Sequence, residues 1–269
     1  MRIARFTLPG GDPTFGLVEL ESDAGQFPNT VAAVYGDPLT AAVKPTGARH
    51  DLDDVRLLAP VIPRSKVVCM GRNWADHVAE MHTEGPTSPT VFIKPNTAVI
   101  GPEQAIVKPE ETGFLSYEGE LAIVIGRICR RVPADRADDV IFGYTCANDV
   151  TARDLQAQED QWTRAKGFDT FCPLGPWIVT DLEAADASDL RIVTRVDDKV
   201  VQDGTTADMV MSIPDIVAFV SGFTTLLPGD VLLSGTPAGV GPIVAGQRVA
   251  VEISRVGTLT NPVVDEAGA

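Results

Sequence analysis

Two glutamates stand two residues apart at the start of an apolar run. The segment reads Tyr117-Glu118-Gly119-Glu120, and Leu121 to Ile125 follows without a polar residue. Such a run is typical of a buried strand, and residues two apart in a strand point to one face. We therefore expect the two carboxylates to lie side by side. They repel, more strongly when buried, so a proton, a basic side chain or a cation must neutralise them. The pair alone also fits a solvated strand end.

Asp149 offers a third carboxylate. It follows the apolar stretch Ile141 to Ala147 within the segment GYTCANDVTARD, so it ends a predicted strand. Three carboxylates and water form an oxygen-rich site that suits Mg²⁺, Mn²⁺ or Ca²⁺ rather than zinc. The three histidines also lack the HExxH spacing of many zinc enzymes.

His77 and Glu80 stand three residues apart in a helix that we predict over Trp74 to Met81. Residues at this spacing share a helix face and can touch. A carboxylate beside an imidazole orients the ring and favours its charged form, which suits a general base. The same spacing also fits an ordinary surface salt bridge. Of the other histidines, we expect His82 at the surface and His50 in a connector between domains.

A lysine and a glycine-rich string are the other features that could do chemistry. Lys166 lies in the segment WTRAKG, where a lone lysine in a loop is usually solvated. The string GTPAGVG, from Gly235 to Gly241, lacks the order of a dinucleotide fingerprint and the Lys-Ser/Thr of a P-loop. We interpret it as a tight turn beside the site.

The elements that must position these residues are mostly strands. Asp189 to Gln202 shows two β-rich halves around Asp197-Asp198, which is typical of a hairpin. Val231 to Leu233 and Val249 to Ile253 are further predicted strands. Many strands with few helices predict a β-dominated α+β fold.

One helix has clear start and stop signals. Ser212 can cap it and Pro214 suits its first turn. Pro228-Gly229 stops it. Between these limits apolar residues recur at helical spacing, namely Ile216, Val217, Val220, Phe223 and Leu227.

Residues 1–60 differ from the rest of the chain. They hold short apolar stretches such as Phe15 to Leu20, broken by Gly, Pro and Asp, and no catalytic constellation. Val55 to Pro63 is interpreted as the connector. We therefore expect a small N-terminal β-rich domain over residues 1–60 and a catalytic domain over residues 61–269.

Composition limits the partners. The chain has 269 residues, and its 22 Lys and Arg against 37 Asp and Glu give a net charge of -15. That field repels nucleic acid and anionic membrane surfaces. An anionic substrate would need a local positive centre, from basic side chains or a bound cation. Four cysteines without a Cys-x-x-Cys pair predict buried free thiols in a reducing cytoplasm, and no signal-peptide pattern opens the chain.

Four segments resemble the fumarylacetoacetate hydrolase family, in the family's order from about residue 60 to the end. They are GRNWADHVAEM, YEGELAIVIG, GYTCANDVTARD and LLPGDVLLSGTPAGVGP. The resemblance implies a mixed β-roll or sandwich, usually a homodimer, with one Mg²⁺ or Mn²⁺ bound by Glu118, Glu120 and Asp149. It also implies that His77 and Glu80 form a dyad that orients a water.

The resemblance further implies substrate contacts and a class of reaction. Lys166 would lie next to metal and substrate, and the remaining positions with implied substrate contacts are Arg72, Asn73, Arg153, Gln156 and Thr236. The implied substrates are small 2-oxo or 2,4-dioxo acids. We favour C–C bond cleavage, by acylpyruvate hydrolysis or by decarboxylation of the oxaloacetate type, through a metal-bound enolate. The alternatives are 2-hydroxyhepta-2,4-diene-1,7-dioate isomerisation and a non-catalytic metal-stabilised binding protein.

Overall fold

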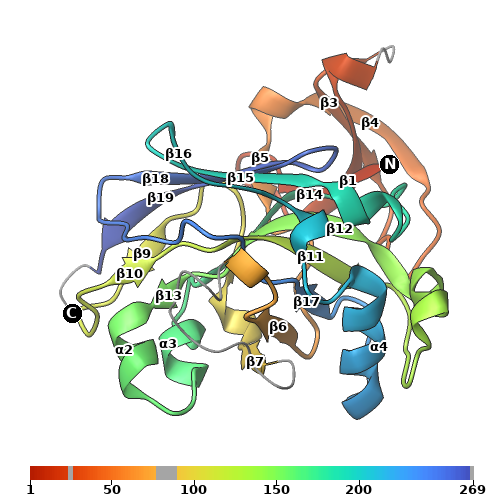
Figure 1. The fold of residues 1–269 in the computed structure, drawn as a ribbon. Coiled ribbons are helices and arrows are strands. Elements are labelled where there is room, and N and C mark those ends of the chain that lie inside the picture. The colour runs from red at the N-terminus through yellow and green to blue at the C-terminus, as the bar shows by residue number, and fades with distance from the viewer. Residues whose placement is uncertain (24–26, 77–89, 267–269) are drawn as a thin grey trace.

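The structure, a computed structural model, describes residues 1–23, 27–76 and 90–266. Strands dominate it, in one large twisted sheet, a smaller five-stranded sheet packed across it and a two-stranded pair, with few helices (Figure 1). This confirms the prediction of a β-dominated α+β fold. No helix among the described residues is long and apolar enough to span a membrane.

The large sheet carries most of the strands that lead to the candidate site. Its main path, in spatial order, is β4 (Pro45–Asp51), β3 (Thr30–Val34), β2 (Thr14–Glu19), β1 (Arg2–Thr7), β14 (Cys172–Val179), β12 (Ile141–Asn148), β11 (Gly119–Ile125), β17 (Val231–Leu233), β6 (Val67–Gly71) and β7 (Thr90–Lys94). Off this path, β5 (Arg56–Leu58) pairs with β1, and β8 (Val99–Ile100) pairs with β14.

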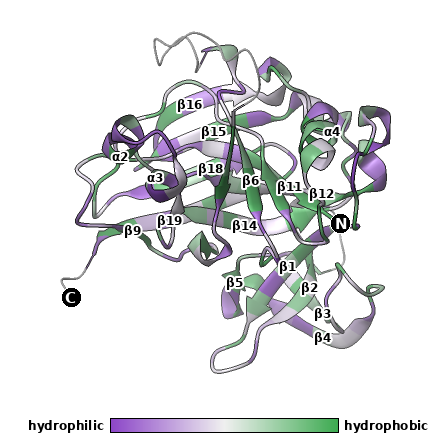
Figure 2. Ribbon diagram, turned by 90° about the horizontal axis from the view of Figure 1, so that it is seen from below, coloured by the Kyte–Doolittle hydropathy of each residue, from purple (hydrophilic) through white to green (hydrophobic). Residues whose placement is uncertain are grey.

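The N-terminal strands are hydrogen-bonded into the rest of the molecule. Strand β1 pairs with β2 on one side, and its first residues pair with the end of β14 on the other. Figure 2 shows β2, β3 and β4 together at one end of the molecule. His50 lies in β4 opposite Val31, so its predicted place in a connector is wrong. The interpreted connector, Val55 to Pro63, itself contains β5, because that segment pairs with β1.

The smaller sheet and the short pair lie near the site. The five-stranded sheet has the order β16 (Lys199–Thr205), β15 (Arg191–Val196), β18 (Arg248–Ile253), β19 (Gly257–Asp265) and β9 (Ile106–Lys108), and the pair is β10 (Leu115–Ser116) with β13 (Thr151–Ala152). The predicted hairpin is confirmed as β15 and β16. Asp197 and Asp198 have φ of 47° and 66°, the left-handed values that a tight hairpin turn requires.

The described α-helices are α2 (Arg153–Gln158), α3 (Thr163–Gly167) and α4 (Ile213–Phe223). Short 3₁₀ turns are η1 (Glu21–Asp23), η2 (Leu52–Asp54), η3 (Asn96–Ala98), η4 (Ala134–Asp139), η5 (Asp186–Asp189) and η6 (Thr206–Asp208). Of the helix predicted over Trp74 to Met81, residues 77–81 lie outside the described residues.

Helix α4 begins as predicted and ends earlier than predicted. The Ser212 side chain accepts a hydrogen bond from the Asp215 N–H, which confirms the cap. The helix ends at Phe223, and Thr224 is already extended. Pairing explains the difference, because Leu226 exchanges backbone hydrogen bonds with Cys129 and cannot stay helical.

Strand β11 separates two apolar cores. Leu121, Ile123 and Ile125 point into a core shared with the five-stranded sheet and α4, whereas Ala122 and Val124 point into the opposite core. Every residue of β11 is buried, as its unbroken apolar sequence predicts. The four cysteines are also buried free thiols, as predicted. The alternation along β11 fixes the face on which its first residues project.

A buried aspartate fixes the start of β6 and β17, the parallel strands that lead to the site. Asp230 is fully buried and accepts hydrogen bonds from the Ser65 hydroxyl, the Lys66 ammonium and the Leu227 N–H, at 2.6, 2.6 and 2.9 Å. Because Lys66 precedes β6 and Asp230 precedes β17, this ion pair sets the register in which the two strands begin.

We expect Asp230→Ala to lower the free energy of unfolding by about 3–5 kcal/mol, because it leaves buried donors and a charge without a partner. Urea denaturation followed by circular dichroism would measure the change. Asp203→Ala is the control, because its pair with Arg191 is exposed and is worth about 0–1 kcal/mol. Equal losses in the two variants would contradict this role for Asp230.

Candidate metal centre and active site

A cavity of about 430 Å³ opens where several strands of the large sheet begin or end. Glu118 directly precedes β11 and Glu120 lies at its start. Asp149 follows β12, Gly235 follows β17, and Arg72 follows β6. The described lining residues are Met70, Gly71, Arg72, Phe92, Phe114, Ser116, Glu118, Glu120, Asp149, Arg153, Gln156, Ala157, Trp162, Lys166, Gly235, Thr236, Val240 and Gly241. Segments far apart in the sequence therefore meet at one hollow.

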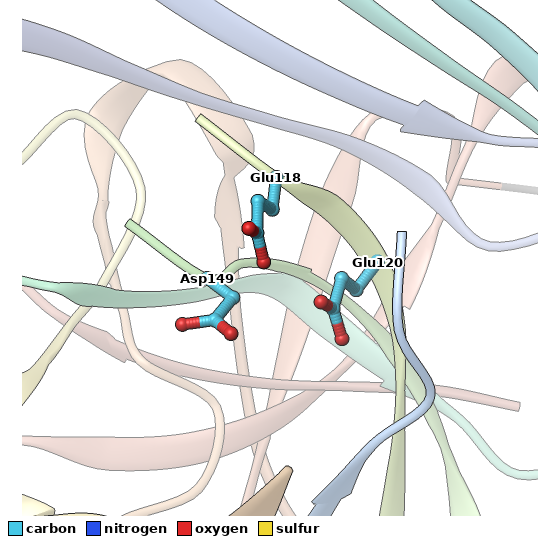
Figure 3. Close-up of side chains that lie close together, drawn as sticks. All are labelled: Glu118, Glu120 and Asp149. Atoms are coloured by element: carbon cyan, nitrogen blue, oxygen red, sulfur yellow. The ribbon is translucent and has the colours of Figure 1, made fainter. Parts of the chain in front are cut away.

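The three predicted carboxylates converge in this cavity (Figure 3). Glu118, Glu120 and Asp149 are 5%, 2% and 1% exposed. Each offers a carboxylate oxygen, and these three oxygens lie within 4.8 Å of one another. Glu118 and Glu120 continue the alternation of β11 toward the same face, as their spacing predicts. The geometry is that of an all-oxygen cation site.

Basic side chains pair with two of the three carboxylates. The Lys166 ammonium donates to Glu118 and to Asp149, at 2.8 Å each. Arg153 forms an ion pair with Glu118. Lys94 donates to the other oxygen of Asp149 at 2.5 Å and to the Val150 carbonyl at 3.1 Å. Lysines therefore hold both oxygens of Asp149.

Glu120 is the carboxylate without such a partner. No basic side chain among the described residues forms an ion pair with it, and it accepts the Gly235 N–H at 2.7 Å. Burial, followed by the nearby Asp149 and Glu118 charges, raises the pKa of Glu120 well above its ordinary value. A buried carboxylate in this position needs a proton or a cation. A divalent cation fits, because it would satisfy Glu120 and relieve the repulsion among all three acids.

Lys166 is the lysine that lines the cavity. Burial alone would lower its pKa, but the Asp149 and Glu118 carboxylates outweigh this effect and raise it. The ammonium also lies 4.9 Å from the centre of the Phe92 ring, a cation–π contact. Lys166 is therefore a fixed positive charge at the cavity wall rather than a solvated loop residue.

Arg72 also lines the cavity. Its guanidinium stands 5.8 Å from the Trp162 ring centre, and its backbone has a φ of 59°, which costs energy for a residue with a side chain. Phe92 packs edge-on against Trp162 at 5.5 Å. A positive group is thus held beside an apolar wall, an arrangement that suits an organic anion.

The other predicted substrate-contact residues divide into two groups. Arg153, Gln156 and Thr236 line the cavity, and Arg153 donates to the Gln156 side chain at 2.9 Å. Asn73 is not among the described lining residues. Its side chain donates to the Ser234 carbonyl at 2.8 Å and exchanges hydrogen bonds with Met211, so it holds the strand that precedes the glycine-rich turn.

Lys94 and the aromatic wall did not emerge from sequence reasoning. Lys94 is fully buried and comes from β7, in the segment VFIKP. A lysine within an apolar strand is the signal that could have found it, because such a lysine must have a buried partner. His77 and Glu80, the predicted dyad, lie outside the described residues.

The comparison with family models covers almost the whole chain. Residues 66–264 match the model described as fumarylacetoacetate (FAA) hydrolase C-terminal. Residues 1–60 match a model described as Rv2993c-like, N-terminal. A human protein named oxaloacetate tautomerase FAHD2A, mitochondrial, is 42% identical over 220 residues, 78% of this chain and 70% of its own.

Solved structures agree with the family model. A 2-hydroxyhepta-2,4-diene-1,7-dioate isomerase from Mycobacterium marinum is 46% identical with a TM-score of 0.89, over the full length of both chains. A maleylpyruvate hydrolase from Sphingobium sp. SYK-6, in complex with manganese(II) and pyruvate, is 32% identical with a TM-score of 0.80, over 99% of this chain and 100% of its own. This chain is therefore an enzyme of the fumarylacetoacetate hydrolase family.

Proposed function

We propose that this enzyme cleaves a C–C bond in a small 2-oxo or 2,4-dioxo acid, with one Mg²⁺ or Mn²⁺ held by Glu118, Glu120 and Asp149. The reaction is hydrolysis of an acylpyruvate or decarboxylation of an acid of the oxaloacetate type. The observation that carries the proposal is the buried Glu120 carboxylate, which has no basic partner among the described residues and faces a cavity lined by cationic side chains.

A bound divalent cation would supply Lewis-acid stabilisation of negative charge on a substrate oxygen. The related maleylpyruvate hydrolase structure, which contains manganese(II) and pyruvate, supports both the ion and the kind of ligand. In this chain Lys166 adds a fixed positive charge at the same place. Its ammonium is already oriented by Glu118 and Asp149, so it can stabilise developing negative charge without rearranging.

The arginines bind and orient the acid. Arg72 lies against Trp162, and Arg153 is held by Glu118 and Gln156, so both guanidinium groups are restrained beside the cavity. The wall formed by Phe92 and Trp162 excludes water from one side. These features localise an anion in a protein whose net charge of -15 would otherwise repel it.

His77 and Glu80 supply the water-activating step of our proposal. His77 removes a proton from a water molecule, and Glu80 orients the imidazole and stabilises its charged form. The water attacks the distal carbonyl of an acylpyruvate, whereas decarboxylation needs no attacking water. The intact pair in the sequence is our reason to place C–C cleavage first.

Isomerisation is the second candidate. The Mycobacterium marinum relative carries the name of a diene-dioate isomerase, and the human relative that of an oxaloacetate tautomerase. Proton transfer within a 2-oxo acid would use the same Lys166 and the same cavity. Parallel assays on acetylpyruvate, fumarylpyruvate and oxaloacetate, with product analysis for cleavage and for enol–keto exchange, separate the candidates. Enol–keto exchange without cleavage of any of the three acids would overturn C–C bond cleavage as the function. The implied homodimer stays a prediction.

We expect Glu120→Gln to weaken Mn²⁺ binding by more than the roughly 10–100-fold typical of losing an outer-shell partner, because a charged ligand is lost. Isothermal titration calorimetry would measure the dissociation constant. Glu252→Gln is the control, since Glu252 is exposed on β18 and pairs with Arg195. Unchanged Mn²⁺ affinity in Glu120→Gln would contradict the proposed ligand set.

The stability of the metal-free protein should depend on pH through Glu120. Burial, with the Asp149 and Glu118 charges, raises the pKa of Glu120 above its ordinary 4.5 in the folded state, so the folded protein keeps a proton that the unfolded chain releases. This stabilisation is full below pH 4.5 and is lost as pH rises through the raised pKa.

The glutamine of Glu120→Gln cannot titrate, so this contribution of residue 120 does not change with pH in the variant. Above pH 4.5 the free energy of unfolding of the wild type should therefore fall relative to that of the variant, with a slope of up to about 1.4 kcal/mol per pH unit. Urea denaturation in the presence of a chelator, repeated from pH 4 to 8, tests this expectation. A difference that stays constant with pH would show that Glu120 does not titrate as proposed.

We expect His77→Ala to reduce acylpyruvate hydrolysis by roughly 10²-fold or more, the usual scale for a general base. Mn²⁺ binding should survive, and oxaloacetate decarboxylation should fall less. The measurement is the ratio of the two rates in variant and wild type at saturating Mg²⁺. Small equal losses would mean that His77 and Glu80 form only a salt bridge. Large equal losses would point to closure of the site instead of water activation.

A further inference from the structure

The five-stranded sheet rests directly on the residue between two of the acids. Gly119 continues the face of Leu121 and Ile123, opposite to the face of Glu118 and Glu120. A Cβ at Gly119 would lie 2.1 Å from the Thr194 hydroxyl and 3.3 Å from a Val251 methyl carbon. The second sheet therefore reaches the backbone of the acid-bearing strand, and its position there depends on the missing side chain.

Gln202, on β16 of that second sheet, connects this strand to the glycine-rich turn. Its side chain is 1% exposed. The side-chain oxygen accepts the Gly119 N–H at 3.0 Å, and the side-chain NH₂ donates to the Thr236 hydroxyl at 2.7 Å and to the Pro237 carbonyl at 2.8 Å. The Thr236 hydroxyl in turn donates to the Gly119 carbonyl at 2.9 Å. The three residues form a closed ring of hydrogen bonds.

The direction of each bond in this ring is fixed by chemistry. A backbone N–H can only donate and a carbonyl can only accept, so the Gly119 and Pro237 contacts determine which end of the Gln202 amide is oxygen. The single proton of the Thr236 hydroxyl is committed to Gly119. Toward the cavity, Thr236 therefore has only a lone pair left to offer.

The ring also reaches Glu120. Gly235, the residue before Thr236, donates its N–H to the Glu120 carboxylate. A turn that shifted away from β11 would lengthen this bond and free the carboxylate to rotate. The side-chain amide of Gln202 binds both the turn and the strand. Gln202 is not among the described residues that line the cavity.

We propose that Gln202 is a positioning residue, which sets the geometry of Glu118 and Glu120 for a cation through Gly119 and the Gly235–Thr236 turn. The inference rests on the proposed metal site and extends it to a residue of the second sheet.

The test compares Gln202→Met with a control of similar cost. Methionine fills the same space without polar groups, and it leaves the Gly119 N–H unpaired. Asn261→Leu removes a buried amide that donates to the Gly101 and Gln104 carbonyls, and none of these three residues is among the described residues that line the cavity. Both variants should lose stability. We expect the Mn²⁺ dissociation constant, by isothermal titration calorimetry, to rise roughly 10–100-fold in Gln202→Met, as for other outer-shell partners, and to stay unchanged in Asn261→Leu.

A second readout does not depend on the ion. In the metal-free protein, hydrogen–deuterium exchange at the Gly119 and Gly235 amides should be faster in Gln202→Met than in Asn261→Leu. Thr236→Val breaks the ring but keeps the Gln202 bond to Gly119, so we expect a smaller rise in the Mn²⁺ dissociation constant. This variant also serves if Gln202→Met does not fold.

The outcomes distinguish the two proposals. If the wild type binds no Mn²⁺, the proposed metal site fails, and amide exchange alone decides whether Gln202 positions the strand and turn. If the wild type binds Mn²⁺ and both Gln202→Met and Thr236→Val bind it equally well, the positioning role is overturned and the metal site stands. An equal rise of the Mn²⁺ dissociation constant in Asn261→Leu would show that the effect is general destabilisation. This outcome would also overturn the positioning role of Gln202.

Discussion

Three carboxylates buried within 4.8 Å of one another impose the constraint that organises this molecule. Left alone in a dry interior, such a cluster would be strongly unfavourable. Lys94, Lys166 and Arg153 each bring a positive charge to it, from β7, α3 and the start of α2. The ends of several strands have to meet at one place to bring these groups together, and the large sheet with its parallel β6 and β17 is the framework that does so.

The shared direction of the Glu118 and Glu120 side chains could be predicted because the information is local. A two-residue spacing before an apolar run fixes the relative direction of Glu118 and Glu120 whatever the rest of the chain does. The cap at Ser212 and the turn at Asp197-Asp198 are likewise decided by a few neighbours. Lys94 could not be assigned in the same way, because its partner Asp149 lies 55 residues further along the chain. The early end of α4 also depends on a distant segment, since Cys129 pairs with the residues that would have extended the helix.

The two sheets have different tasks at the site. The strands of the large sheet lead to the charged groups. The five-stranded sheet carries no proposed ligand, and it sets the position of the backbone at Gly119 and at the Gly235–Thr236 turn. Gly119 allows the two sheets to approach closely, and Gln202 converts that contact into a defined backbone position. Both residue types of the Glu-Gly-Glu motif therefore have a reason. The two glutamates must project from one face of the strand, and the five-stranded sheet packs so close to the other face that residue 119 can have no side chain.

The internal ion pairs have a consequence for how the enzyme acquires a cation. Lys94, Lys166 and Arg153 compensate the charges of Glu118 and Asp149 whether or not an ion is present, so the ion or a proton has only Glu120 left to neutralise. Small zinc domains behave differently, because their binding energy is their folding energy. At the proposed site of this enzyme, folding and metal loading would be separate events. With a cation at the proposed site, a pool of folded protein would gain or lose activity as free Mg²⁺ or Mn²⁺ rises or falls, with no molecule having to unfold.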